Sequence, residues 1–212
     1  MEIVRQGSRH VLPATLCALA AAACLSAGSA QAEAPATSEA KVMAWQVEPD
    51  APLSHYAAVA PSATNLNVVS VVLACEKAGD RNVLQLQLYL TDDGPLLPRG
   101  ATPADLTTQP GAEIAIDGRI FPVSLLFGDQ YAVLADRQVE GFAALSDGLV
   151  DEMAKGRTMT VRLNLLADHR GMADGFDGEA VVDLEAGGGR AAIQAVRRCA
   201  SPTANQTVGL VH

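Results

Sequence analysis

Alternating and continuous apolar runs predict most of the strands. In Val83–Leu90 leucines occupy every second position with glutamines between them, which is typical of a strand with one buried face. Thr158–Leu165 alternates in the same way, with Met, Val and Leu on one side and Thr, Arg and Asn on the other. Val68–Ala74 is apolar and rich in β-branched residues throughout, which predicts a buried strand. Since Gly79 and Asp80 form a turn signal before Val83, these two neighbouring runs are expected to pair as a hairpin.

A second hairpin is predicted at Asp117-Gly118. The Asp-Gly pair lies between Glu113–Ile116 and Arg119–Val123, and Asp-Gly between apolar runs favours a two-residue hairpin turn. Before it, 91–111 contains four prolines and is expected to be a long loop. After Thr158–Leu165, a further strand is expected over Glu179–Leu184.

Two segments have a helical period. Over 142–155 the apolar residues recur at helical spacing, and Gly156 follows as a C-cap. The segment 190–199 is predicted to be a second short helix with Ala192, Ile193 and Val196 facing inward. Many strands with two late helices indicate an α+β protein with a mainly antiparallel sheet or a small β-sandwich. The face expected to be buried in the first helix comprises Phe142, Leu145, Leu149 and Met153.

The first 32 residues have the three parts of a secretory signal peptide. A basic start with Arg5 and Arg9 precedes an apolar run, Val11–Leu25, and small residues then end in Ala30-Gln31-Ala32. An N-terminal membrane anchor is the first alternative, but the run is shorter than the roughly 20 residues that span a bilayer. Lipidation of Cys24 is the second alternative.

The rest of the chain is expected to form one domain. Residues 33–67 are predicted to be a partly disordered lead-in with a short strand near Trp45, because Ala, Pro, Ser and Thr dominate its first part. The β-rich domain is expected over 68–200, and 201–212 reads as a loose tail. No segment after the leader is apolar and long enough to predict a membrane span.

Charge and cysteine content fit an exported protein. The formal net charge of −9 argues against nucleic acid as a partner, since nucleic-acid binding needs basic patches. Removal of the leader leaves one pair of cysteines, Cys75 and Cys199, which is expected to form a disulfide in an oxidising compartment. A redox-active pair is the alternative, although no C-x-x-C motif is present. Closing so long a loop would stabilise by roughly 4–5 kcal/mol in the chain-entropy model.

Two loops are candidate binding sites. The loop after Thr158–Leu165 is a candidate calcium site, because its acidic residues supply the hard oxygen ligands that calcium prefers. The alternative is a solvated loop rich in turn residues. The turn Gly187-Gly188-Gly189-Arg190 opens a helix and would offer backbone N–H groups and a guanidinium to an anion, or it only turns a strand into a helix. The acidic positions in question are Asp168, Asp174, Asp177 and Glu179, beside His169.

No catalytic motif is recognisable. His55, His169 and His212 are scattered after the leader and form no zinc or triad pattern, and no cofactor-binding motif occurs. A pair of carboxylates brought together only by folding would leave no local signature. The sequence therefore favours a protein that is not an enzyme, with a hydrolase that uses dispersed carboxylates as the alternative.

The order of elements resembles that of small exported bacterial proteins. An early strand ending in Leu73-Ala74-Cys75 is followed by the Ile116-Asp117-Gly118 hairpin, by an amphipathic helix ending at Lys155-Gly156, and by a last helix ending at Cys199. This order is similar to that of the invasion-associated locus B family and of type VI secretion-associated periplasmic proteins. The resemblance implies a periplasmic or secreted accessory protein that binds an unknown protein partner in the cell envelope. A small-ligand or ion-binding protein is a further alternative.

The leader makes a direct prediction about the mature protein. Expressed in a bacterium that exports it, the chain should lose residues 1–32 and begin at Glu33, with Cys75 and Cys199 both unreactive to thiol reagents. Intact-mass measurement of the protein from the periplasmic fraction, with and without reduction, tests both points. A cytosolic product that retains Met1 and two free thiols would contradict the prediction.

Overall fold

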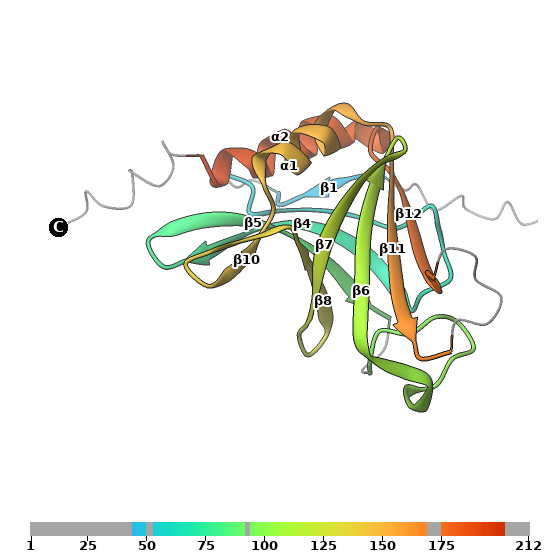
Figure 1. Cartoon of the computed structure of the whole chain (residues 1–212). Helices are drawn as coiled ribbons and strands as arrows, with labels where there is room; N and C mark the ends of the chain where they lie inside the picture. The colour runs from blue at the N-terminus through green and yellow to red at the C-terminus, as the bar shows by residue number, and fades with distance from the viewer. Residues whose placement is uncertain (1–43, 50–52, 92–93, 169–174, 202–212) are drawn as a thin grey trace, which may run out of the picture. The chain divides into compact units, whose positions relative to one another are not determined.

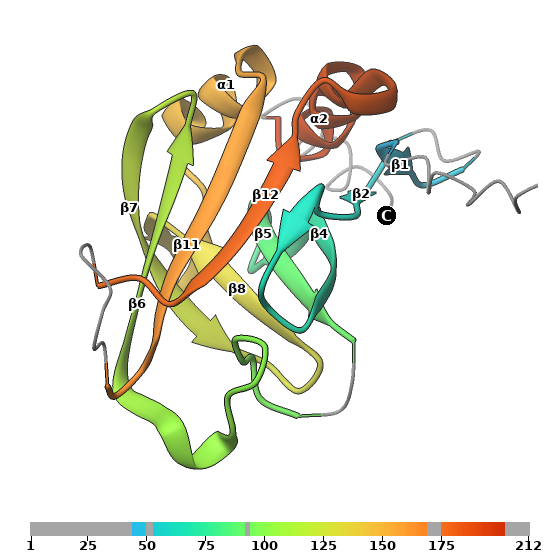
Figure 2. The same ribbon diagram turned by 90° about the vertical axis from the view of Figure 1, so that its right-hand side faces the viewer.

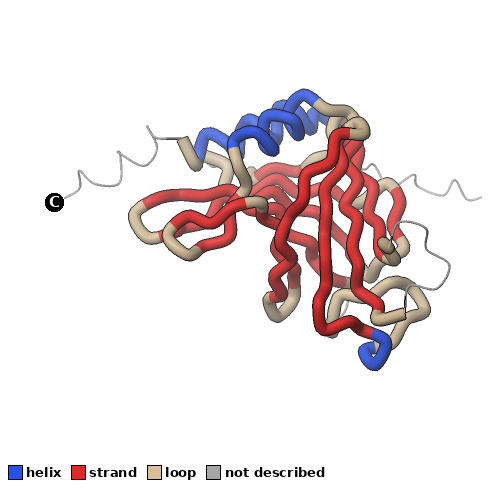
Figure 3. Tube along the Cα trace, in the orientation of Figure 1, coloured by secondary structure: helices blue, strands red, loops and turns tan. Residues whose placement is uncertain are grey.

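A computed structural model describes residues 44–49, 53–91, 94–168 and 175–201 (Figure 1). The predicted leader 1–32, most of the expected lead-in, and residues 202–212 of the expected tail lie outside this range. Strands dominate the described part of the chain, and two helices accompany them (Figure 3). The α+β prediction with a mainly antiparallel sheet is confirmed.

Ten strands form one antiparallel sheet in the order β1-β2-β4-β5-β8-β7-β6-β11-β12-β3. A separate hairpin pairs β9 (Arg137–Val139) with β10 (Phe142–Ala144). The two-residue turn Asp117-Gly118 joins two strands of the sheet, and both residues have positive φ, 47° and 88°, as a type I′ turn requires. The strands of the sheet are β1 (Gln46–Val47), β2 (Tyr56–Val59), β3 (Ala63–Thr64), β4 (Val68–Ala78), β5 (Arg81–Leu90), β6 (Leu106–Ile116), β7 (Arg119–Phe127), β8 (Tyr131–Ala135), β11 (Thr158–Leu166) and β12 (Gly178–Asp183).

The sheet must curl, because β3 and β4 are close in the chain and far apart in the strand order. Seven strand spacings separate them in the sheet, which would be about 33 Å if it were flat. The chain from Thr64 to Val68 reaches at most about 15 Å. The strands therefore form two walls, one around β4, β5 and β8 and one around β6, β7, β11 and β12 (Figure 2).

Two helices lie side by side across one end of the curled sheet (Figure 1). Helix α1 (Asp147–Lys155) is N-capped by Ser146, whose hydroxyl accepts the N–H of Leu149. Helix α2 (Gly189–Cys199) follows the short 3-10 turn Ala186–Gly188. Apolar side chains from both helices and from the inner face of the sheet make one continuous core. The helical contribution comprises Leu149, Val150, Met153, Ala154, Ala192, Ile193 and Val196.

Helix α1 is shorter than the sequence predicts. It starts at Asp147 rather than near 142, because Glu140 and Gly141 adopt positive φ and turn β9 into β10. Phe142 lies in β10 with 46% of its surface exposed, so it is not part of the buried helical face. Leu149 and Met153 are buried as expected, and Gly156 is the C-cap.

Two further boundaries and the burial of one strand differ from the prediction. The ordered domain begins before Val68, since β1, β2 and β3 precede it and pair with β2, β4 and β12 respectively. Strand β6 begins at Leu106, inside the expected loop, after a 3-10 turn at Pro103–Asp105. In β5 the outward side chains Gln85 and Gln87 are buried rather than exposed, because they hydrogen-bond to each other and to Ala143 and Glu76.

The Asp117 carboxylate fastens the β6–β7 turn to the start of β11. It accepts the N–H of Thr158 and the N–H of Arg157, each at 3.0 Å, and these two hydrogen bonds lower the pKa of Asp117 below 3.8. A lowered pKa in the folded state stabilises the fold above the ordinary pKa, and this stabilisation is lost as the pH falls through the lowered value.

Asp117→Asn should therefore be less stable than the wild type at neutral pH and should lose the difference in acid. Asparagine tolerates positive φ, so the turn itself is kept. Urea unfolding at a series of pH values from about 6 down to about 2 measures the difference. Asp129→Asn, at an exposed turn, controls for the change in net charge. A stability difference for Asp117→Asn that is the same at all pH values would contradict the assignment.

Candidate functional site

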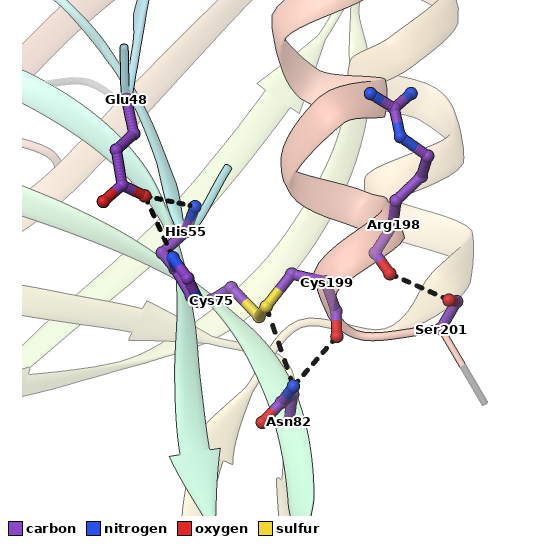
Figure 4. The surroundings of a disulfide bond; sticks show 7 residues. All are labelled: Glu48, His55, Cys75, Asn82, Arg198, Cys199 and Ser201. Carbon is purple, nitrogen blue, oxygen red and sulfur yellow. Dashed lines mark hydrogen bonds and ion pairs between the residues drawn. A yellow bond between two sulfur atoms is a disulfide. The ribbon is translucent and has the colours of Figure 1, made fainter. Parts of the chain in front are cut away.

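The disulfide joins the end of helix α2 to the sheet (Figure 4). Cys75 lies in β4 and Cys199 ends α2, with 6.3 Å between their Cα atoms. The side-chain amide of Asn82 donates to the carbonyl of Cys199 at 3.0 Å. Beside Cys75, the carboxylate of Glu48 accepts hydrogen bonds from the backbone and the ring of His55, which lowers the pKa of Glu48. The disulfide therefore joins the helix layer to the wall of the sheet that contains β4.

The acidic loop is not assembled as a cation site in the described residues. Asp177 is 4% exposed, and its carboxylate accepts the N–H groups of Leu165 and Leu166 at 2.7–3.0 Å, so it closes the β11–β12 connection. Asp168 and Glu179 are exposed, and Asp174 and His169 lie outside the described residues. Within the described ranges no three His, Cys, Asp or Glu side chains are grouped as metal ligands.

The glycine turn before α2 is tightly packed at Gly189. A Cβ on Gly189 would clash with Trp45 and with the carbonyl of Leu184. Gly188 has a φ of 90°, which glycine adopts readily. Arg190 donates from Nε to the carbonyl of Ala154 at 3.0 Å, so its guanidinium is held against the end of α1. These contacts favour the strand-to-helix turn over the anion site.

A shallow groove lies on the outer face of β2, β4 and β5, and we call it the tyrosine groove. Its floor is made of small or narrow side chains on β2 and β4, and it has a volume of about 500 Å³. Val72 lies between Ala58 and Gln87 in the strand register, and the next outward residue, Ala74, lies beside Tyr56. The lining residues include Tyr56, Ala58, Val69, Ser70, Val72, Ala74, Glu76, Gln87 and Tyr89.

All three tyrosines of the chain lie on this face. Tyr89 is opposite Ser70 on one side and Tyr131 on the other, and the two tyrosine rings stack with 5.3 Å between their centroids. Tyr56 stands at the other side of the floor, opposite Ala74. Tyr56 and Tyr89 are 41% and 37% exposed, so their rings are available to a partner. A break in the register between Val68 and Ser70 also turns Val69 outward, where it is 44% exposed.

Hydrogen bonds fix the polar groups of the groove. The buried amide of Gln87 donates to the carboxylate of Glu76 at 3.1 Å and to the side-chain oxygen of Gln85 at 3.2 Å. Gln85 in turn donates to the carbonyl of Ala143 in β10 at 2.8 Å. The Glu76 carboxylate is thus held at the groove by a hydrogen-bond chain that begins in the β9–β10 hairpin.

Two other hollows contain charges that already have partners. One, of about 740 Å³ near the end of α2, is lined by Arg137 and Arg197; Arg137 donates to the carbonyl of Leu145, and Arg197 pairs with Asp151. The other, of about 450 Å³, lies at β3, β11 and β12 and is lined by Arg162 and Phe176; Arg162 lies over the Phe176 ring and pairs with Glu113 on β6 at 2.7 Å.

The strands beside Arg162 carry two carboxylates on the same face. In the strand register Arg162 lies between Glu113 on β6 and Glu179 on β12. The guanidinium of Arg162 thus separates the two carboxylates.

The groove was not predicted from the sequence. Its residues come from positions 55–89 and the neighbouring Tyr131, and only the strand register places them together. The one local signal is the row of small or narrow outward positions in β4, Ser70, Val72 and Ala74. In the sequence this row reads simply as part of a buried strand.

The fold and the groove define a curled antiparallel sheet with two covering helices and an open aromatic face. No family model, no curated protein and no solved structure matches the chain. In the described part of the chain, no helix combines the length and apolar character needed to cross a membrane.

The titration of Tyr89 tests the geometry of the groove. Burial raises the pKa of Tyr89 above 10.0, and the neighbouring Tyr131 and Glu76 add to the shift. In a Tyr56→Phe, Tyr131→Phe background only Tyr89 titrates as a tyrosine, and Glu76→Gln should then lower its pKa. Absorbance near 295 nm as a function of pH measures the change. Glu179→Gln, on the other wall, should leave the Tyr89 pKa unchanged, and equal effects of the two substitutions would contradict the arrangement.

Proposed function

We propose that this chain is an exported, non-enzymatic accessory protein of the cell envelope that binds a partner protein through the tyrosine groove. The observation that carries the proposal is the position of Tyr56 and Tyr89 beside a floor of small side chains, with Tyr131 stacked on Tyr89. Tyrosine gives a large, rigid contact area at low cost in conformational entropy and is enriched where proteins bind one another. An exposed row of this kind on an otherwise well-packed sheet is typical of an interaction surface.

Several features support the extracytoplasmic location. The signal-peptide pattern of residues 1–32 favours export, and disulfides form and persist mainly in oxidising compartments. The resemblance to exported accessory proteins favours the same setting. The rival hypothesis, a hydrolase with dispersed carboxylates, is weakened because Arg162 pairs with Glu113 and lies between it and Glu179.

Site-specific crosslinking in living cells tests the proposal. A photoreactive phenylalanine analogue placed at Tyr56 or Tyr89 should give the same covalent adduct in the envelope fraction. The matched control is Ile120, which is 56% exposed on the outer face of β7 and should not give this adduct. Val72→Trp, which fills the floor of the groove, should abolish the adduct while near-UV circular dichroism and thermal unfolding show an intact fold.

Three results would contradict the proposal. The first is a set of adducts that is the same at Ile120 as at the tyrosines. The second is a protein that stays in the cytosol. The third is turnover of an envelope substrate by the purified mature chain, which would favour the hydrolase instead.

A further inference from the structure

The carboxylates at the tyrosine groove are Glu76, which lines it, and Glu48, which lies beside it. Glu48 is bound to His55, which also lines the groove. Among the described residues that line the groove, none is a lysine or an arginine. The other large hollow differs, since Arg81, Arg137 and Arg197 all line it. The groove is therefore an acidic and aromatic surface on a chain that is acidic as a whole.

The carboxylate of Glu76 is oriented before any partner arrives. One of its oxygens accepts the amide of Gln87, which is 2% exposed and is itself held by Gln85. A buried amide that donates to a carboxylate keeps that carboxylate in one place, so a cation that binds there does not have to order it. Part of the Glu76 side chain remains exposed to solvent and available to a second donor.

The remaining walls suit the apolar stem of a basic side chain. Lysine and arginine place their methylene groups on apolar surface and keep the charge at a polar or aromatic site. Val72, Ala74 and Val69 give the apolar surface, and the rings of Tyr56 and Tyr89 are aromatic groups that attract cations.

The form of the groove favours a polypeptide over a small molecule. Pockets for small ligands enclose most of the ligand. This groove instead lies open on the outer face of a sheet, and its aromatic border continues to Tyr131 on β8. We propose that the tyrosine groove binds a segment of a partner protein that carries lysine or arginine beside apolar residues, with the basic group at Glu76. This inference rests on the proposed function and names the chemistry of the partner.

Calorimetry with three matched peptides tests the inference on the mature, oxidised full chain. The probe is an acetylated and amidated Leu-Lys-Ser-Leu-Lys peptide, and in the two controls both lysines are replaced by glutamine or by glutamate. The lysine peptide should bind about tenfold more tightly than the glutamine peptide at low salt, and the glutamate peptide more weakly still. The advantage of the lysine peptide should shrink as salt is added.

Variants locate the binding site. Glu76→Gln should weaken binding of the lysine peptide about fivefold and leave the glutamine peptide unchanged, and Tyr89→Leu should weaken the lysine peptide about fivefold. Glu179→Gln removes an exposed acid from the other wall and should change nothing. Thermal unfolding of each variant checks that the fold is kept.

The results distinguish failure of this inference from failure of the proposed function. Equal binding of the lysine and glutamine peptides, equal effects of Glu76→Gln and Glu179→Gln, or no binding of the lysine peptide overturns the inference. If the crosslinks at Tyr56 and Tyr89 still form in that case, the proposed function stands and only the chemistry of the partner is wrong. If those crosslinks also fail, the groove is not the binding surface.

Discussion

The short connection between β3 and β4 is the constraint on which the rest of the structure depends. Residues 65–67 join a strand at one end of the sheet order to a strand near the other end. The sheet can satisfy this connection only by curling, and the curl gives it an inner and an outer face. The side chain of Asn65 stabilises this connection, because its amide N–H donates to the carbonyl of Asp177 and its side-chain oxygen accepts the N–H of Glu179.

The curl also explains the position of the helices. A curled sheet has an open end through which its apolar interior would meet water, and α1 and α2 cover that end (Figure 1). Their buried faces complete the core, in keeping with the general need of a sheet to bury its apolar face against another element. The disulfide from Cys75 to Cys199 and the contact of Arg190 with the end of α1 hold this layer in place.

The same curl leaves the outer face of β2, β4 and β5 uncovered by any described helix. The small outward residues on β4 form the floor of the groove, and the tyrosines on β2 and β5 form its borders. The binding surface proposed for this protein is thus a by-product of how the core is built. Its polar part is linked to the fold by the hydrogen bonds from Ala143 through Gln85 and Gln87 to Glu76.

The amino-acid sequence by itself determined the local elements. The alternation in β5 and β11, the Asp117-Gly118 turn and the apolar face of α2 were all predictable, because strand and helix periods depend on neighbours a few residues away. The pairing of Cys75 with Cys199 was predictable, because these are the two cysteines outside the predicted leader. The prediction that Phe142 lies on the buried face of a helix was wrong. Phe142 has helical spacing from the apolar residues that follow it, but Glu140 and Gly141 form a hairpin turn there.

Only the tertiary structure decided which outward residues meet. Tyr56, Tyr89 and Tyr131 come together because strand register and sheet order are set by the core on the opposite face, and that information is distributed over the whole chain.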